Sequence, residues 1–352
     1  MVGRAVGTGG GEVEPKVSSL PERSYEWNPD QTVWVPGTPS PTKPDPKYLF
    51  IGFLSNVDES FLEVKTLAAC RIRKLDPKLT YHLVSRVRPA EEFDTVKFLT
   101  HDTNCMVDRE SPAYALTRGI KIKHEVTPPG QVPYTEILVE QFKLLKEIER
   151  LEAGLRIFHI GNVQVPFQTV VMVDGNQLSR VSFGWGAEHV ARDPFAVSPS
   201  EVPSLRGFLS SFSLPLKPEF LGLAYGQLKS ANVQPRDDMR LVFAWTGMEL
   251  LFRRSRKNVG YQVSSHAATL LAPQGEERIR LQKGLKKLFE LRSDILHDGE
   301  SGRVKPEHAQ TLVHLLQRCL RRCLELGLPK DDLLEGLEKG TVAPGPAGST
   351  AS

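Results

Sequence analysis

Between residues 47 and 200 the hydrophobic positions mostly follow the spacing of β-strands. Short runs that are continuously apolar, or that alternate between apolar and polar residues, are typical of strands buried on one or both faces. Such runs occupy residues 48–54, 81–87, 120–126, 155–160 and 169–173. The last run is followed by Asp174-Gly175-Asn176, a sequence that favours a tight turn.

One segment of this region, 135–151, has helical spacing instead. Its apolar residues recur every three or four positions and predict an amphipathic helix with one buried face. They are Leu138, Phe142, Leu145 and Ile148. Gly154 is a plausible stop for this helix, because glycine readily adopts the left-handed backbone of a helix end. We therefore expect an α+β domain over residues 47–200. Residues 175–216, rich in Ser, Pro and Gly, are expected to form a connector.

From residue 217 onward the pattern becomes helical. Apolar side chains recur at helical spacing in several consecutive segments, as in a bundle of helices. The segments are 241–252, 264–271, 275–297 and 306–327. Pro218 and Pro235 fit the first turn of a helix, where the missing N–H costs nothing. The pattern predicts an all-α helical bundle over residues 217–327.

The two ends of the chain lack such patterns. Residues 1–46 hold eight prolines and several glycine clusters, and residues 340–352 are rich in Gly, Ala and Pro, so both are expected to be disordered. The four cysteines favour a reducing cytoplasm over a disulfide-built secreted fold. No apolar run approaches the length of a membrane span, so no membrane contact is expected.

Charge is distributed unevenly along the chain. Residues 217–327 hold 19 Lys and Arg against 12 Asp and Glu, whereas the whole chain has a net charge of only +3. The densest positive run is Arg253, Arg254, Arg256 and Lys257 at a predicted helix end. It could follow an RNA backbone, or its cations could simply complement a helix C-terminus. On charge alone, a polyanionic partner and a set of solvated helix faces are equally compatible with the sequence.

The chemically most informative residues are Arg292 and His297. Arg292 lies in the apolar face formed by Leu285, Leu288, Phe289, Ile295 and Leu296. A guanidinium remains charged there, so it requires an anion or hydrogen-bond acceptors. His297, near the helix end at Gly299, could transfer a proton near neutral pH. Five residues turn an ideal helix by about 500°, so the two side chains point about 140° apart and a second surface must complete a site.

Glu249 lies on the apolar side of its own predicted helix and therefore needs a cation. Arg292 is one candidate partner, and Arg253, four residues along the same helix, is another. Arg292 could otherwise bond a helix C-terminus, with His297 merely capping its helix. Cys319 and Cys323 are spaced like half of a metal site, but they fall on an apolar stripe, which favours packing.

The sequence Leu-Arg-Ser-Asp-Ile-Leu-His-Asp-Gly at 291–299 resembles the Arg-x4-His motif of HEPN domains, nearest to the Apea-like branch. Two upstream blocks extend the resemblance over about residues 217–327. They are Gly-Met-Glu-Leu-Leu-Phe at 247–252 and Tyr-Gln-Val-Ser-Ser-His-Ala-Ala-Thr-Leu-Leu at 261–271. Many active members have Asn, Asp or His directly after the arginine. This chain has Ser293, which is usual in the Apea-like pattern, so the departure bears on the reaction rate more than on the family.

The resemblance implies a metal-independent endoribonuclease without a cofactor. Arg292 would hold the scissile phosphate, and His297 would serve as acid or base. Glu249 and Ser293 would support them, and Arg253, Arg254, Arg256 and Lys257 would bind RNA. It also implies a homodimer through the C-terminal helices, in which two motifs share one cleft. The α+β domain would then recognise an unknown trigger, in a prokaryotic defence or toxin-like setting.

Two other functions fit the same sequence. A non-catalytic HEPN module would bind RNA, a nucleotide or a protein partner without cleaving it. A helical scaffold would explain the amphipathic helices but not the arginine within an apolar face.

Overall fold

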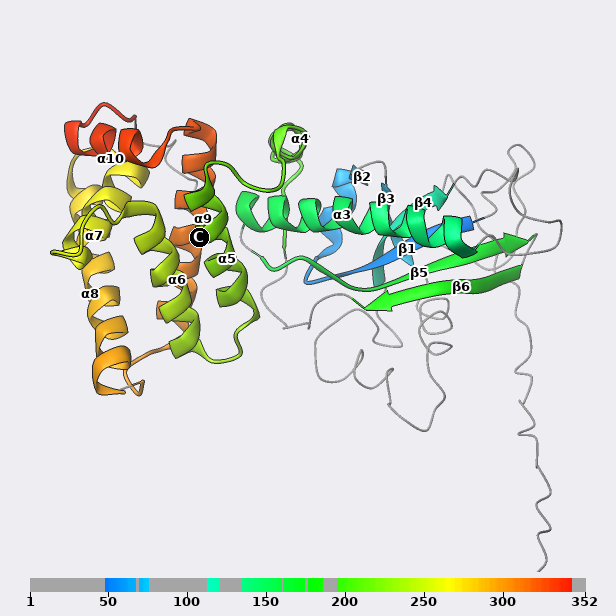
Figure 1. Ribbon diagram of the computed structural model, residues 1–352, viewed down its shortest axis with the longest axis horizontal. Helices are drawn as coiled ribbons and strands as arrows, with labels where there is room; N and C mark the ends of the chain where they lie inside the picture. Colours follow the sequence, from blue (N-terminus) through cyan, green and yellow to red (C-terminus); the bar gives the residue numbers. More distant parts are fainter. Residues whose placement is uncertain are drawn as a thin grey trace, which may run out of the picture.

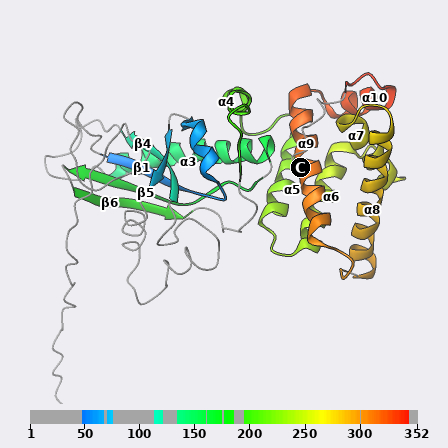
Figure 2. The same ribbon diagram turned by 180° about the vertical axis from the view of Figure 1, so that it is seen from behind.

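The computed structural model describes residues 48–67, 70–75, 113–120, 134–159, 161–174, 177–185, 195–299 and 301–343. Figure 1 shows a sheet with one long helix beside it, next to a bundle of helices, and Figure 2 shows the same arrangement from behind. The predicted order, an α+β region followed by a helical region, is therefore confirmed. The leader at 1–46, the strand predicted at 81–87 and most of the tail at 340–352 lie outside the described residues.

Within the described residues, six strands form one antiparallel sheet in the order β2-β3-β4-β1-β5-β6. The strands are β1 (Tyr48–Ser55), β2 (Thr66–Leu67), β3 (Cys70–Leu75), β4 (Ala113–Ile120), β5 (Gln164–Asp174) and β6 (Gln177–Trp185). A short 3-10 helix, η1 (Glu59–Val64), follows β1. Every residue of β1 is buried, and Ile51 pairs with Thr117 on one side and Thr169 on the other. The central position of β1 explains its continuous apolar sequence.

The strand predictions were partly correct. The runs at 48–54 and 169–173 lie within β1 and β5, as predicted. Of the strand predicted at 120–126, only Ile120 belongs to the described residues, and it is the last residue of β4. The predicted connector, 175–216, was wrong. It contains β6, paired with β5, and α4 (Val202–Ser211). Backbone pairing with β5 satisfies the hydrogen-bonding groups on one edge of β6, although its sequence is rich in polar residues.

Helix α3 (Tyr134–Phe158) is longer than predicted, and the strand predicted at 155–160 is wrong. Gly154 does not end the helix. It lies within α3 because a Cβ there would come 2.5 Å from Cδ2 of Leu209 in α4. Glycine is needed at this position for close packing and not for a change of backbone direction. The residues after it, apart from Arg156, are apolar because the end of α3 is buried on all sides.

The buried face of α3 also differs from the predicted one. Leu138 and Phe142 are 42% and 60% exposed and Leu145 is half-buried, whereas Ile148 is buried as predicted. Ile137 and Leu144, which were not predicted, are also buried against the sheet. Both sets of residues satisfy helical spacing. Only the position of the sheet determines which set is covered.

Six helices form the C-terminal bundle of the described chain. They are α5 (Glu219–Val233), α6 (Asp237–Phe252), α7 (Val259–Leu271), α8 (Glu276–Asp298), α9 (Pro306–Leu326) and α10 (Lys330–Lys339). The four predicted segments lie within α6 to α9, although α7 begins earlier than predicted and α9 ends at Leu326. Helix α10 was not predicted. Pro218 immediately precedes α5, but Pro235 lies before α6 and not in its first turn.

Helix α3 joins the two parts of the molecule. Its Ala153 and Ile157 belong to the bundle core, whereas its earlier apolar residues pack on the sheet. Helix α9 satisfies the carbonyl groups at the end of α3. Gln317 Nε2 donates to the oxygen of Arg156 at 2.7 Å, and Arg321 Nη1 donates to that of Phe158 at 3.0 Å. These bonds fix the end of α3 on the bundle.

Cys319 and Cys323 are buried in the bundle core, as the packing interpretation predicted. Burial raises the pKa of both thiols, that of Cys323 to about 12. No group of three or more His, Cys, Asp or Glu in the described parts of the chain could hold a metal ion. None of the helices described in the structure is long and apolar enough to span a membrane.

Candidate functional site

Helix α8 places Arg292 at the edge of the bundle core. Leu285, Leu288 and Leu291 are buried, whereas Leu296, predicted to share the apolar face, is 48% exposed. The Arg292 side chain is 20% exposed, and its Nη2 lies 3.4 Å from Oε1 of Glu249 in α6. The guanidinium of Arg292 therefore pairs with Glu249, the carboxylate that the sequence suggested as its partner.

Glu249 accepts contacts from three side chains, including both candidate cations. Its Oε1 accepts a hydrogen bond of 2.9 Å from Trp245 Nε1, and its Oε2 lies 3.3 Å from Arg253 Nη1. The carboxylate is only 12% exposed, so these partners offset the cost of its burial. Trp245 was not predicted as part of the site. Its position four residues before Glu249, on the same helix face, could have indicated the bond.

An aromatic contact fixes α8 relative to α6 and α7. The ring of Phe289 packs against that of Trp245, with centroids 5.3 Å apart. On its other side it lies close to Gly260 of α7, where a Cβ would come 2.5 Å from Phe289 Cδ1. The sequence blocks 247–252, 261–271 and 291–299 therefore lie on three helices that pack together.

Not every polar group of Arg292 is satisfied. Its Nε is buried and has no hydrogen-bond partner among the described residues. Ser293, the next residue, is half-buried, and its hydroxyl makes no hydrogen bond with the described part of the chain. A buried donor without an acceptor costs free energy, so an anion that accepts from it would be favoured.

His297 lies in the exposed last turn of α8. Its imidazole makes no hydrogen bond or ion pair with any described residue, and the structure does not bring it into contact with Arg292 or Glu249. It does not cap the helix either. Gly299, with φ of 70°, ends α8 and donates its N–H to Asp294 O. On an ideal helix His297 lies about 7.5 Å along the axis from Arg292.

The basic loop, defined by Arg253, Arg254, Arg256 and Lys257, connects α6 with α7. Gln262 organises it, since its Oε1 accepts from the N–H groups of Arg254 and Ser255. Two of the four cations are paired, Arg253 with Glu249 and Arg254 with Glu338 of α10. Arg256 and Lys257 are exposed, and their side chains have no partner among the described residues. Arg253, the first residue of the basic loop, therefore pairs with Glu249, the same carboxylate that pairs with Arg292.

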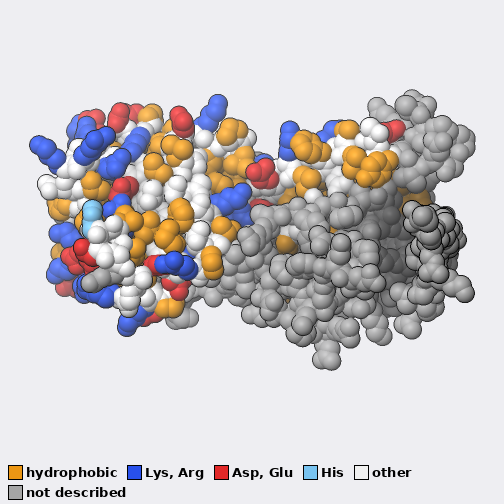
Figure 3. Space-filling view, turned by 60° about the horizontal axis from the view of Figure 1, so that its bottom comes forward, with side chains coloured by type: hydrophobic (Ala, Val, Ile, Leu, Met, Phe, Trp, Pro, Cys, Tyr) orange, Lys and Arg blue, Asp and Glu red, His pale blue; other side chains and the backbone are white. Residues whose placement is uncertain are grey.

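On the face drawn in Figure 3, Lys and Arg side chains are spread over the helical end of the molecule among acidic and hydrophobic ones. They do not form one continuous patch on that face. On that face, electrostatic attraction of a polyanion would therefore depend on local groups of cations more than on a uniformly positive surface.

Among the described residues, this region offers a guanidinium with a buried donor that lacks a partner, two exposed cations of the basic loop and, separate from Arg292, an exposed imidazole. A guanidinium can hold an oxyanion, and an imidazole can transfer a proton. The chain matches no protein-family model, and neither the curated proteins nor the solved structures contain a significant match to it.

Proposed function

We propose that this protein is a metal-independent endoribonuclease of the HEPN type, in which Arg292 and His297 act on the scissile phosphodiester. The observation that supports the proposal most is the state of Arg292. It is held against Glu249 by one nitrogen, while a second nitrogen, Nε, is buried without a partner among the described residues. Arg253 of the basic loop pairs with the same Glu249, so the loop lies next to Arg292 and would guide the RNA backbone toward this arginine.

The reaction needs only groups that the RNA and this chain supply. One imidazole takes the proton of a ribose 2′-hydroxyl, whose oxygen attacks the adjacent phosphorus. The bond from phosphorus to the 5′-oxygen breaks, and a protonated imidazole gives that oxygen its proton. Arg292 would stabilise the negative charge that develops on the phosphoryl oxygens. The products are a 2′,3′-cyclic phosphate and a 5′-hydroxyl end.

A second copy of the chain would complete the site, because His297 points away from Arg292 on its own helix. The proposed dimer would form through the C-terminal helices, with Arg292 near the two-fold axis. A groove of about 460 Å³ between α8 and α9, floored by Leu281, Leu285, Leu288, Leu291 and Leu315, offers apolar surface for such an interface. Sedimentation of a monomer that still cleaves RNA at micromolar concentration would contradict this arrangement.

The α+β region would regulate the bundle. Helix α3 passes from the sheet into the bundle core, so a change at the sheet could reach the helices through it. We place the protein, on the family resemblance, in a prokaryotic defence or toxin-like setting with a trigger recognised by residues 47–200.

The purified protein is expected to cleave RNA in the presence of EDTA, because the 2′-hydroxyl is the nucleophile and no metal-bound water is required. Product ends should be 2′,3′-cyclic phosphate or 3′-phosphate, together with 5′-hydroxyl. Mass spectrometry of the products from a defined oligonucleotide measures this. The matching oligonucleotide with 2′-deoxyribose at the cleaved position should remain intact. Loss of cleavage in EDTA, with recovery on adding Mg²⁺, would contradict the mechanism.

Charge removal in the basic loop is expected to weaken RNA binding. Arg256→Ser combined with Lys257→Ser removes two cations that have no partner among the described residues, so the stability should hardly change. If each contacts one phosphate of single-stranded RNA, the slope of log K against log salt should become shallower by about 1.4. Titrations at several salt concentrations measure this. The control, Lys143→Ser with Lys146→Ser, removes the same charge from α3. Equal slopes for the wild type and the loop variant would show that these cations only complement the helix C-terminus and do not contact RNA.

A non-catalytic module that binds RNA, a nucleotide or a protein partner is the second candidate. The observation that favours it is the exposed His297, which has no contact with Arg292 or Glu249 in a single copy. Such a module would retain the salt-dependent binding by the loop but show no cleavage that depends on His297.

A further inference from the structure

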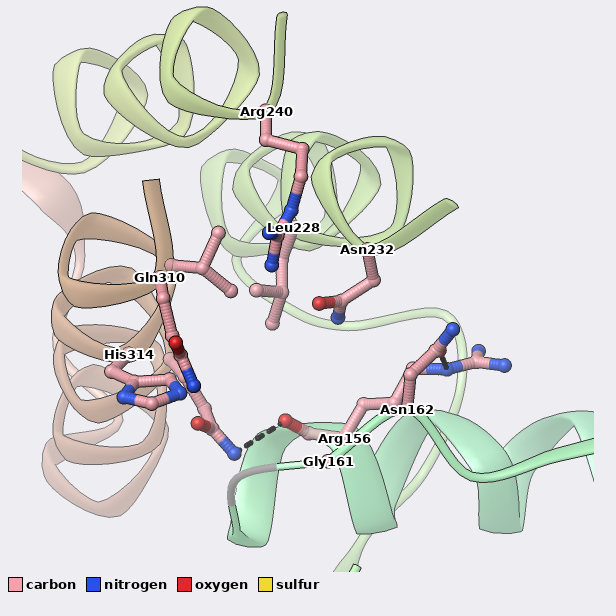
Figure 4. A pocket seen from close by; sticks show the side chains of 10 residues that line it. Arg156, Gly161, Asn162, Leu228, Asn232, Arg240, Gln310 and His314 are labelled. Atoms are coloured by element: carbon pink, nitrogen blue, oxygen red, sulfur yellow. Dashed lines mark hydrogen bonds between the residues drawn. The ribbon is translucent and has the colours of Figure 1, made fainter. Parts of the chain in front are cut away.

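A small polar cavity lies where the α+β region meets the bundle (Figure 4). Its volume is about 30 Å³. Four elements enclose it: the end of α3 with the turn that follows, and helices α5, α6 and α9. The described residues that line it are Arg156, Gly161, Asn162, Leu228, Asn232, Arg240, Gln310, Val313, His314 and Gln317.

The lining is rich in hydrogen-bond donors. It includes two arginines, one histidine and four carboxamides, and none of the described lining residues is Asp or Glu. The carboxylates that pair with these arginines are not among the described lining residues. Glu152 pairs with Arg156, and Asp237 pairs with Arg240 Nη1 at 2.8 Å. A cation would find no carboxylate among the described lining residues and two guanidinium groups close by.

Two of the cavity's polar groups are deeply buried and incompletely bonded. Arg240 is 8% exposed, its side chain extends from α6 into the cavity, and its Nε has no hydrogen-bond partner among the described residues. Asn162 is 1% exposed, and its Nδ2 likewise has no partner there. Its Oδ1 is already used, since it accepts from Arg156 Nε at 3.0 Å. Both unpaired groups are therefore donors.

We propose that this cavity binds a small oxyanion of the phosphate class. A polar cavity needs about 10–15 Å³ for one water, so this one accommodates about two water-sized oxygen atoms. Because the cavity is partly open to solvent, the other oxygens of a phosphate group would lie at its mouth. Arginine recognises such oxyanions through a planar fork that ammonium groups lack. The anion could be free phosphate or the phosphate group of a nucleotide, since both present the same oxygens. Neither source requires ribonuclease activity, so the inference is independent of the proposed function.

The position of the cavity gives the anion a second role. Asn162 follows α3, whereas Arg240 and His314 belong to the bundle (Figure 4). An anion that accepts from Asn162 and Arg240 would tie the two parts together. It would thereby stabilise the junction that Gln317 already makes with the end of α3.

Isothermal titration of the full chain with inorganic phosphate tests the proposal, with chloride at matched ionic strength as the salt control. We expect one saturable site and, at about ten times the dissociation constant, a rise in the thermal midpoint of roughly 2–4 °C. Adenosine 5′-monophosphate distinguishes the sources. Tighter binding than phosphate indicates a nucleotide, and weaker binding indicates the free anion. No saturable heat and no midpoint shift with either compound would overturn the proposal.

Two substitutions locate the site. Gln310→Glu keeps the side-chain size but places a carboxylate near Arg240, so it should abolish phosphate binding. Arg240→Met should also abolish binding, although it could impair folding, and Gln310→Glu keeps the test valid in that case. The control, Arg236→Met, removes an arginine that pairs with Asp238 outside the cavity and should bind phosphate as the wild type does. Unchanged binding by Gln310→Glu, or equal loss in the control, would place the anion elsewhere.

Discussion

His297→Ala is expected to reduce RNA cleavage by about two to four orders of magnitude, the usual contribution of a positioned acid or base. The folded state should be retained. His297 is exposed in the last turn of α8, its side chain makes no hydrogen bond with the described residues, and alanine is the best helix former. Single-turnover cleavage of a labelled RNA measures the rate, and circular dichroism through thermal unfolding checks the fold.

Asp298→Ala provides the matched control. Asp298 is exposed in the same turn, so its removal changes the surface and charge of the helix end without removing an imidazole. It should cleave at nearly the wild-type rate. If wild type and His297→Ala cleave every RNA tested equally, with the trigger supplied, the binding-module function should replace the ribonuclease. If both variants lose activity equally, the helix end as a whole is required and not the proton transfer.

Arg292→Lys is expected to lose cleavage almost as completely as His297→Ala although it keeps the positive charge. A lysine ammonium can still pair with Glu249, so the free energy of unfolding should change little. It cannot at the same time present a planar fork to the phosphate. Arg292→Met should lose cleavage as well. It should also destabilise the protein by about 1–3 kcal/mol, because Glu249 would keep its burial but lose one of its cations.

Urea unfolding of both variants separates the two effects. The control, Arg303→Lys, alters an arginine that pairs with Asp294 of the same helix at the surface. It should keep both stability and cleavage. Full cleavage by Arg292→Lys would show that Arg292 contributes only a positive charge and that its planar guanidinium is not needed. Equal destabilisation by Lys and Met would show that the geometry of the Glu249 pair, and not its charge, holds α8 in place.

The sequence by itself determined the elements whose patterns are local. The four predicted bundle segments follow from apolar side chains at helical spacing, because a helix brings residues three and four apart onto one face. The continuous apolar run at 48–54 indicated a buried strand and proved to be the central strand of the sheet. The sequence also brought Arg292 and Glu249 together as a hypothesis, since two opposite charges on apolar helix faces each need a partner.

Tertiary structure decided what local patterns leave open. Gly154 was expected to end a helix, but α4 packs against it and the helix continues. Leu138 and Ile137 fit the same periodicity, and only the sheet selected Ile137 for burial. The polar cavity could not have been predicted, because Asn162 and Arg240 are far apart in the chain and become neighbours only when α3 docks on the bundle. Spacing along the sequence reports which residues share one element, whereas contacts between elements depend on how those elements pack.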